Sequence, residues 1–438
     1  MASLRAGLAR TRITPPARSY LIGYGGRLGG NTGVRDELTA TALVLGDGAV
    51  RVGVLAVDML CLHEDVVARV RERVLAEAGI PPEALLVACS HTHAGPIAWA
   101  GRGSAPWRRR LVDRLVGKLA AVVAQAQATL APAELALGKG EAAVAVNRRL
   151  RLPDGRVVEG RNPEGFVDRS LGVVQVREPG GAPRATLVNF ACHPTVLSPR
   201  NRRVSAEWPG VMRAHVEAAT GSSCLFLQGA TGDVNPDHEW GEDDEIAMER
   251  LGRSVADSVL ATLDAGLVPL SGLPLAAVRT EVPLAIDLRR RPDGAVESYA
   301  ETGARWQRIP RPLVEPLVRY AYPWRPRQRP GPDGRPELPM EVQVLRLGDL
   351  ALVAHAAETF SAVGHEIKAR AAAPHALLVG YANGCIGYLP TEEACAEGGY
   401  EVEHAPLPYR ISGTFDPESA GRVTRDSLEL VERLFGAA

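Results

Sequence analysis

Residues 84–96, ALLVACSHTHAGP, join an apolar run of strand length to a polar loop that carries two histidines. A helical pattern precedes the run at Asp65–Ala78 and another follows at Trp107–Ala128, because apolar residues recur there every three or four positions. A short apolar strand between two helices is typical of an α/β fold.

The same alternation continues along the chain. Further strand-length runs lie at Val52–Val57, Ala185–Phe190, Cys224–Leu227, Leu350–Ala354 and Ala376–Val379, and further helical patterns at Pro209–Ala219, Glu245–Ala265, Phe360–Ala372 and Pro417–Phe435. We therefore expect an α/β protein with mixed β-sheets flanked by helices. Its active site is expected at the carboxyl ends of the strands, where ligands gather in open α/β sheets.

One stretch, residues 289–339, differs in composition from the rest. It is rich in arginine and proline and shows little periodicity. We interpret it as a surface insertion packed by its tryptophans and tyrosines, the alternative being a flap over a substrate site. No other stretch predicts a second apolar core, so residues 1–438 are expected to form a single catalytic domain.

Composition excludes several classes of partner. The 50 basic and 51 acidic residues give a formal charge of -1, which offers no reason to expect nucleic acid or an anionic membrane as a partner.

The cysteines and the N-terminus bear on the compartment. None of the six cysteines forms a C-x-x-C pair and several lie in apolar runs, which favours buried thiols of a reducing compartment. The N-terminus lacks the apolar core of a signal peptide, and no run of 18 apolar residues occurs. We expect a cytoplasmic protein with no transmembrane segment.

Chemically capable side chains follow five of the apolar runs. They are His91 and His93, then His193, then Asp233 and Asn235, then Glu358, then Tyr388. Singly they are weak signals: the histidine pair alone could be two hydrogen-bonded loop residues, and Glu358 could favour a helix N-terminus. Together, imidazoles and a carboxylate at strand ends are a ligand set suited to zinc. The other seven histidines lack such a setting and are interpreted as structural.

Four other kinds of enzyme lack their motifs in this chain. There is no G-x-S-x-G nucleophile elbow and no H-E-x-x-H zinc motif. The phosphate-binding G-x-x-x-x-G-K-[ST] and the dinucleotide-binding G-x-G-x-x-G are also absent. A serine α/β-hydrolase, a zincin protease, an NTPase and a dinucleotide enzyme are therefore not expected.

The motifs resemble the amino-terminal catalytic domain of the neutral/alkaline, non-lysosomal ceramidase family. In the family's order they are ITPP, Gly23-Tyr24-Gly25, GVRDELTATALVL, SHTHAGP, Asn147-Arg148, ACHPT, GATGDVNP, AAETF and the pair Tyr388 and Tyr400. The resemblance spans nearly the whole chain, and SHTHAGP is its most specific part. It implies a ceramidase-like catalytic-domain fold.

The resemblance also implies roles for individual residues. The matching positions are His91, His193, Glu358 and Tyr388 as zinc ligands, His93 and Tyr400 as catalytic groups, and Arg148 with Gly23 or Gly25 at the substrate. Tyr388 as a ligand rests wholly on the resemblance.

Two departures from the family pattern matter. Asn235 stands where the family has a serine, which excludes a covalent serine mechanism at this position and leaves Asn235 to hydrogen-bond the substrate. The family also continues into a carboxyl-terminal immunoglobulin-like domain, whereas this sequence ends at residue 438. Both departures predict a short relative with altered specificity.

These observations together predict a zinc-dependent hydrolase that cleaves an amide bond by metal-activated water. We expect a small or lipid-like intracellular acyl-amide substrate, with His93 transferring protons and Tyr400 stabilising the oxyanion. Two alternatives remain: a zinc-dependent esterase or lactonase, and a non-catalytic binding protein on the same fold.

Overall fold

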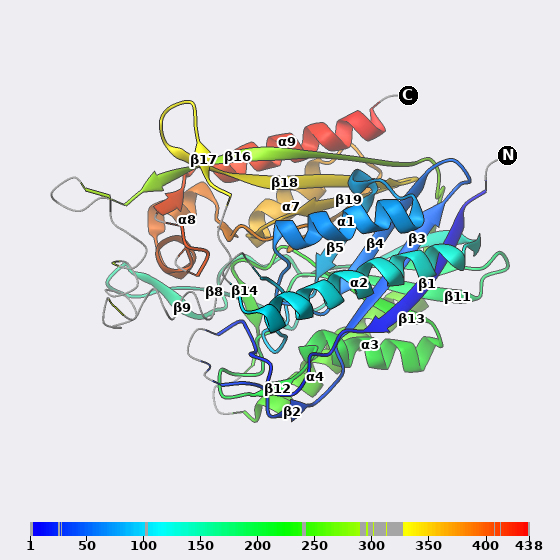
Figure 1. The fold of residues 1–438 in the computed structure, drawn as a ribbon, viewed down its shortest axis with the longest axis horizontal. Coiled ribbons are helices and arrows are strands. Elements are labelled where there is room, and N and C mark those ends of the chain that lie inside the picture. Colours follow the sequence, from blue (N-terminus) through cyan, green and yellow to red (C-terminus); the bar gives the residue numbers. More distant parts are fainter. Residues whose placement is uncertain are drawn as a thin grey trace.

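A computed structural model describes residues 3–24, 27, 29–100, 104–238, 242–289, 295–296, 301, 312, 327–406, 408–411 and 413–436. Within these residues three larger β-sheets each carry a pair of helices (Figure 1).

The first sheet has the strand order β5-β4-β3-β1-β6. Its strands are β1 (Arg5–Arg12), β3 (Thr39–Gly46), β4 (Arg51–Val57), β5 (Leu85–Cys89) and β6 (Ala131–Pro132). Neighbours are antiparallel except β4 and β5, which are parallel and are connected through α1 (Glu64–Ala78). The second helix, α2 (Pro106–Ala128), packs against α1, β1 and β3.

The second sheet repeats this plan in the order β13-β11-β10-β7-β15. Its strands are β7 (Glu134–Glu141), β10 (Ser170–Arg177), β11 (Pro183–Phe190), β13 (Ser223–Gln228) and β15 (Val268–Leu270). Here β11 and β13 are the parallel pair, connected through α3 (Glu207–Thr220). Helix α4 (Asp244–Asp264) packs against α3, β7 and β10.

The third sheet has the order β21-β19-β18-β16-β23, with β17 beside β18. Its strands are β16 (Leu275–Leu288), β17 (Arg329–Pro330), β18 (Pro336–Leu347), β19 (Leu350–His355), β21 (His375–Val379) and β23 (Gly413–Phe415). The parallel pair is β19 and β21, connected through α7 (Ser361–Arg370). Helix α9 (Ser419–Phe435) packs against α7, β16 and β18.

Short elements complete the description. They are β2 (Gly33–Val34) with β12 (Arg203–Val204), β8 (Ala145–Arg151) between β9 (Val157–Asn162) and β14 (Val234–Pro236), β20 (Glu358–Thr359) with β22 (Tyr388–Leu389), the 3-10 turn Pro82–Ala84, α8 (Glu392–Glu397) and the π-helical turn Tyr400–His404.

The parallel edge strands β5, β13 and β21 of the three sheets meet at their carboxyl ends. The backbone N–H of Cys89 donates to the carbonyl of Tyr381 at 3.2 Å, and that of Gly380 to the carbonyl of Gln228 at 2.9 Å. Because each βαβ unit releases its chain at the carboxyl end of a strand, loops from all three sheets converge there.

The second sheet is buried on both faces, as its alternating residues show. Val173, Val188 and Phe226 belong to a core with α3 and α4, whereas Val174 and Leu187 belong to the larger core shared with the other two sheets. Because successive side chains of a strand point to opposite faces and both faces are buried, apolar residues occupy successive positions and the strands appear in the sequence as continuous apolar runs.

The structure confirms the predicted fold class of mixed sheets flanked by helices. The six helices named from the sequence are present, with ends that differ by two residues or fewer. Most of the Arg/Pro-rich stretch 289–339 lies outside the described residues; its last part forms β17 and the start of β18. All six cysteines are free, and five are buried. Among the described residues no helix is both long and apolar enough to cross a bilayer.

Candidate metal centre and active site

His91 follows β5 on a backbone held in an unusual conformation. Its φ is 65°, in the left-handed region that non-glycine residues seldom occupy. The backbone N–H of His91 donates to the carbonyl of Met59 at 2.9 Å, and its ring Nδ1 lies 2.8 Å from the carbonyl of Leu60. A carbonyl only accepts, so Nδ1 carries the proton and Nε2 presents a lone pair. Backbone strain of this kind is concentrated at functional sites.

His193 follows β11 and is oriented in the same manner. Its Nδ1 lies 2.9 Å from the carbonyl of Val234, while Trp208 Nε1 donates to the His193 carbonyl at 3.1 Å. The His193 side chain is fully buried, and its Nε2 has no hydrogen-bond partner among the described residues. A backbone carbonyl on Nδ1 with a free Nε2 is the usual arrangement of a metal-binding histidine.

Glu358 supplies a carboxylate to both imidazoles. It lies on β20, which pairs in parallel with β22 so that Glu358 is opposite Tyr388. Its Oε2 is 3.4 Å from His91 Nε2 and 3.3 Å from His193 Nε2. Burial alone would raise the pKa of Glu358, but the two histidines and hydrogen bonds hold that pKa down at about 2. Burial lowers the pKa of His91 to about 3.

These groups fit a cation. With Nδ1 of each ring facing a backbone carbonyl, both Nε2 atoms point toward the Glu358 carboxylate, 3.4 and 3.3 Å from its Oε2. A cation between them would be attracted by the carboxylate and bound by both nitrogens. Zinc binds such a set of imidazole nitrogens and carboxylate oxygen. His93 extends the cluster, since donor atoms of His91, His93 and His193 all lie within 4.8 Å of one another. A metal could therefore use two histidines with Glu358, or three histidines.

His93 differs from the other two histidines in its surroundings. Its Nε2 is 3.2 Å from His91 Nε2, and its Nδ1 has no hydrogen-bond partner among the described residues. The ring stands 4.9 Å from the ring of Tyr24, and Gly23 lies so close that a Cβ there would be 2.8 Å from the His93 side chain. Burial and the neighbouring histidines lower its pKa well below the ordinary value. His93 Nδ1 is therefore not committed to a hydrogen bond within the described part of the chain.

Arg148 lies beside both predicted tyrosines. Its guanidinium carbon is 5.3 Å from the ring centroid of Tyr388 and 5.6 Å from that of Tyr400. Its Nε donates to Glu401 at 2.8 Å and one terminal nitrogen to Asn235 Oδ1 at 3.4 Å. The other terminal nitrogen is buried and has no partner among the described residues.

The two tyrosines keep their protons in this environment. Their ring centroids are 5.9 Å apart, and burial raises the pKa of each above its ordinary value. In the absence of a cation both phenols therefore carry their protons at neutral pH. Of the predicted site residues, Gly25 lies outside the described residues.

The sequence-based hypothesis missed three residues that hold Glu358 and His91. The Tyr381 ring stacks on His91 at 3.9 Å between centroids, and its hydroxyl donates to Glu358 Oε2 at 3.2 Å. Tyr409 donates to Glu358 Oε1 at 2.6 Å, and Thr231 lies 2.5 Å from the Tyr381 hydroxyl. Tyr381 comes just after an apolar run, so the strand-end rule could have found it. Tyr409 stands in no comparable pattern.

Glu401 was also missed. It accepts hydrogen bonds from Arg148 at 2.8 Å and from Arg149 at 2.8 Å, and it is buried. It adjoins Tyr400, so the π-helical turn places both of these residues against the arginines. A charged residue beside a predicted catalytic tyrosine gave no separate signal in the sequence.

Comparisons with known proteins identify the fold and the family. Two solved structures share the fold. A neutral ceramidase from Pseudomonas aeruginosa matches with a TM-score of 0.76 and 19% identity, and the match covers 100% of this chain and 75% of that chain. A ceramidase complexed with C2 matches with a TM-score of 0.77 and 19% identity, and the match covers 99% of this chain and 75% of that chain. A search of curated proteins gave no significant match. The profile of the neutral/alkaline non-lysosomal ceramidase N-terminal domain matches residues 4–247. The chain therefore belongs to the neutral/alkaline non-lysosomal ceramidase family.

Proposed function

We propose that this protein is a zinc-dependent hydrolase that cleaves the amide bond of an N-acyl substrate. The observation that carries the proposal is the convergence of His91 Nε2, His193 Nε2 and Glu358 Oε2, with both rings oriented by a backbone carbonyl at Nδ1. These three residues would hold the metal, with Tyr388 as the fourth ligand that the family resemblance implies. Zinc in such a site acts as a Lewis acid and activates water at neutral pH.

The remaining residues have distinct tasks. His93 takes the proton of the attacking water and passes it to the leaving amine, because its Nδ1 is not committed to a hydrogen bond. The Tyr400 phenol, kept protonated by burial, donates to the oxyanion that develops on the carbonyl oxygen. The unpartnered nitrogen of Arg148 binds a polar group of the substrate, while Glu401 and Asn235 hold the guanidinium in place.

Substitution of the histidines separates metal binding from catalysis. We expect His193→Ala to lose both bound zinc and turnover, because it removes a ligand. His93→Ala should keep zinc and lose roughly 100–10,000-fold in rate, the usual contribution of a general base. Zinc per chain by elemental analysis and hydrolysis of matched N-acyl amides and esters are the two measurements.

His215→Ala is the control, since His215 lies on the surface of α3 beside Glu249. Equal turnover by His93→Ala and the unchanged protein would contradict the role of His93. Full zinc in His193→Ala would contradict the metal site. Ester hydrolysis without amide hydrolysis would favour an esterase, and bound zinc with neither activity would favour a binding protein.

A further inference from the structure

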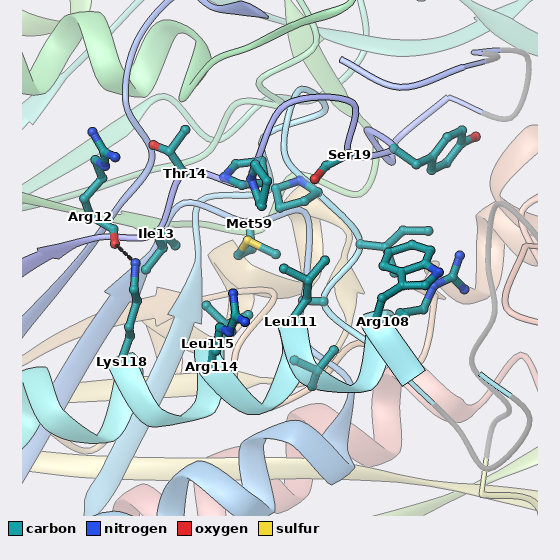
Figure 2. A pocket seen from close by; sticks show the side chains of 18 residues that line it. Arg12, Ile13, Thr14, Ser19, Met59, Arg108, Leu111, Arg114, Leu115 and Lys118 are labelled. Carbon is teal, nitrogen blue, oxygen red and sulfur yellow. Dashed lines mark hydrogen bonds between the residues drawn. The ribbon is translucent and has the colours of Figure 1, made fainter. Parts of the chain in front are cut away.

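A cavity lies beside residues 90–96, the loop that carries His91 and His93 and is called the catalytic loop below. It occupies about 340 Å³ between the amino-terminal half of α2 and the segment 12–20 that leaves β1 (Figure 2). This is within the range of small-molecule sites, about 300–1,000 Å³. Its interior is apolar, with the side chains of Ile13, Met59, Ile97, Leu111 and Leu115 among those that line it. None of the three clustered histidines and no atom of Glu358 lines it.

The charged residues that line this cavity are all basic. Arg12, Arg108, Arg114 and Lys118 line it, and none of its described lining residues is acidic. Arg12 pairs with Glu37 at 3.0 Å. Lys118 Nζ donates to the Arg12 carbonyl at 2.8 Å (Figure 2). Arg114 and Lys118 are exposed and form no ion pair within the described part of the chain. Their charges are therefore available to an anion in solution.

We propose that this cavity binds a fatty acid anion, a single alkyl chain ending in a carboxylate. The apolar interior takes the chain, because burying it removes apolar surface from water. The carboxylate stays at the rim, where Arg114 and Lys118 provide charge-assisted hydrogen bonds. An inorganic anion would leave the apolar interior unused, and a neutral lipid would leave the cations unmatched.

The cavity shares a wall with the catalytic loop. Met59 lines the cavity, and its backbone carbonyl accepts the hydrogen bond from His91 N–H at 2.9 Å. Pro96 also lines it and pairs with Leu21, two residues from the Gly23 that packs on His93. The fatty acid site is nevertheless separate from the metal centre and does not depend on the proposed reaction.

Calorimetric titration of the full chain with sodium dodecanoate, below its micelle concentration, tests the proposal. We expect saturable binding of one dodecanoate per chain. The double variant Arg114→Glu/Lys118→Glu should weaken it by about tenfold or more, because the rim becomes repulsive. Arg110→Glu, the same kind of charge change on an exposed α2 residue that does not line the cavity, should leave the affinity within about twofold. Dodecyltrimethylammonium, with the same chain and the opposite charge, should bind more weakly.

A second variant tests the interior without changing charge. Leu111→Trp fills the cavity and should abolish dodecanoate binding while the melting temperature and the zinc content stay unchanged. The proposal is wrong if the double variant and Arg110→Glu bind alike. It is also wrong if dodecanoate binding survives Leu111→Trp but is lost in Arg148→Ala, which would place the ligand in the metal centre. If Arg114→Glu/Lys118→Glu lost binding to anionic vesicles but kept its affinity for dodecanoate, the basic residues would form a membrane-binding patch, and the proposal would be overturned.

Discussion

Glu207 is a buried carboxyl group outside the metal centre. Its backbone has a φ of 61°, its side chain is fully buried, and its oxygens accept from the N–H groups of Leu197 and Trp208. Burial raises the pKa to about 7 from an ordinary 4.5, although the two N–H donors lower it. The folded chain therefore favours the protonated form of this residue more than the unfolded chain does.

This shift predicts a pH-dependent stability. Between about pH 4.5 and about pH 7 the folded chain holds a proton that the unfolded chain has released, so raising the pH lowers the free energy of unfolding. A difference of about 2.5 units corresponds to about 3 kcal/mol. Urea unfolding of the unchanged protein and of Glu207→Gln, over this pH range, measures the contribution of Glu207 to the free energy of unfolding. The gap between the two free energies should change with pH and level off above about pH 7; a constant gap would contradict the assignment.

At the scale of elements, the placement of Glu358 depends on close packing of β20. Gly232, in the loop after β13, donates its N–H to the carbonyl of Thr359 at 2.9 Å. A Cβ at Gly232 would lie 2.4 Å from the carbonyl oxygen of Glu358 and 2.8 Å from the Phe360 ring. The first of these contacts is with backbone, so the two-residue strand itself would have to move.

Gly232→Ala should therefore weaken zinc binding. Moving β20 displaces the Glu358 carboxylate from His91 and His193, and the loss of such supporting contacts typically costs about 10–100-fold in metal affinity. Competition with a chromogenic chelator measures the affinity. Gly33→Ala is the matched control, since a Cβ at Gly33 meets nothing within 4 Å. Equal zinc affinity in the two variants would show that β20 accommodates the methyl group without moving Glu358.

At the scale of the molecule, the centre joins three sheets. His91 follows β5 of the first sheet, His193 follows β11 of the second, and Glu358 follows β19 of the third. A cation bound by these residues would connect three segments that are distant in sequence. It would stabilise the folded state, in which alone they are neighbours.

Removal of zinc should accordingly lower the melting temperature of the whole chain. A ligand present at about 1,000 times its Kd stabilises the folded state by about 4 kcal/mol. Differential scanning calorimetry with and without a chelator gives the change. His193→Ala should melt at the same temperature in both conditions. A chelator effect of equal size in this variant would mean that the stabilising metal binds elsewhere.

The sequence by itself determined the fold class, because apolar periodicity is local. The apolar run Leu350–Ala354 predicts a strand and the periodic pattern Trp107–Ala128 predicts a helix without reference to the rest of the chain, and the structure confirms both. It also determined which polar residues follow the strands, so His91, His193 and Glu358 were found as candidates. Only the tertiary structure decided that the carboxyl ends of the three sheets meet, and hence that Glu358 Oε2 lies within 3.4 Å of His91 Nε2 and of His193 Nε2. It alone decided the roles of Tyr381 and Tyr409, because contacts between residues distant in sequence leave no local pattern.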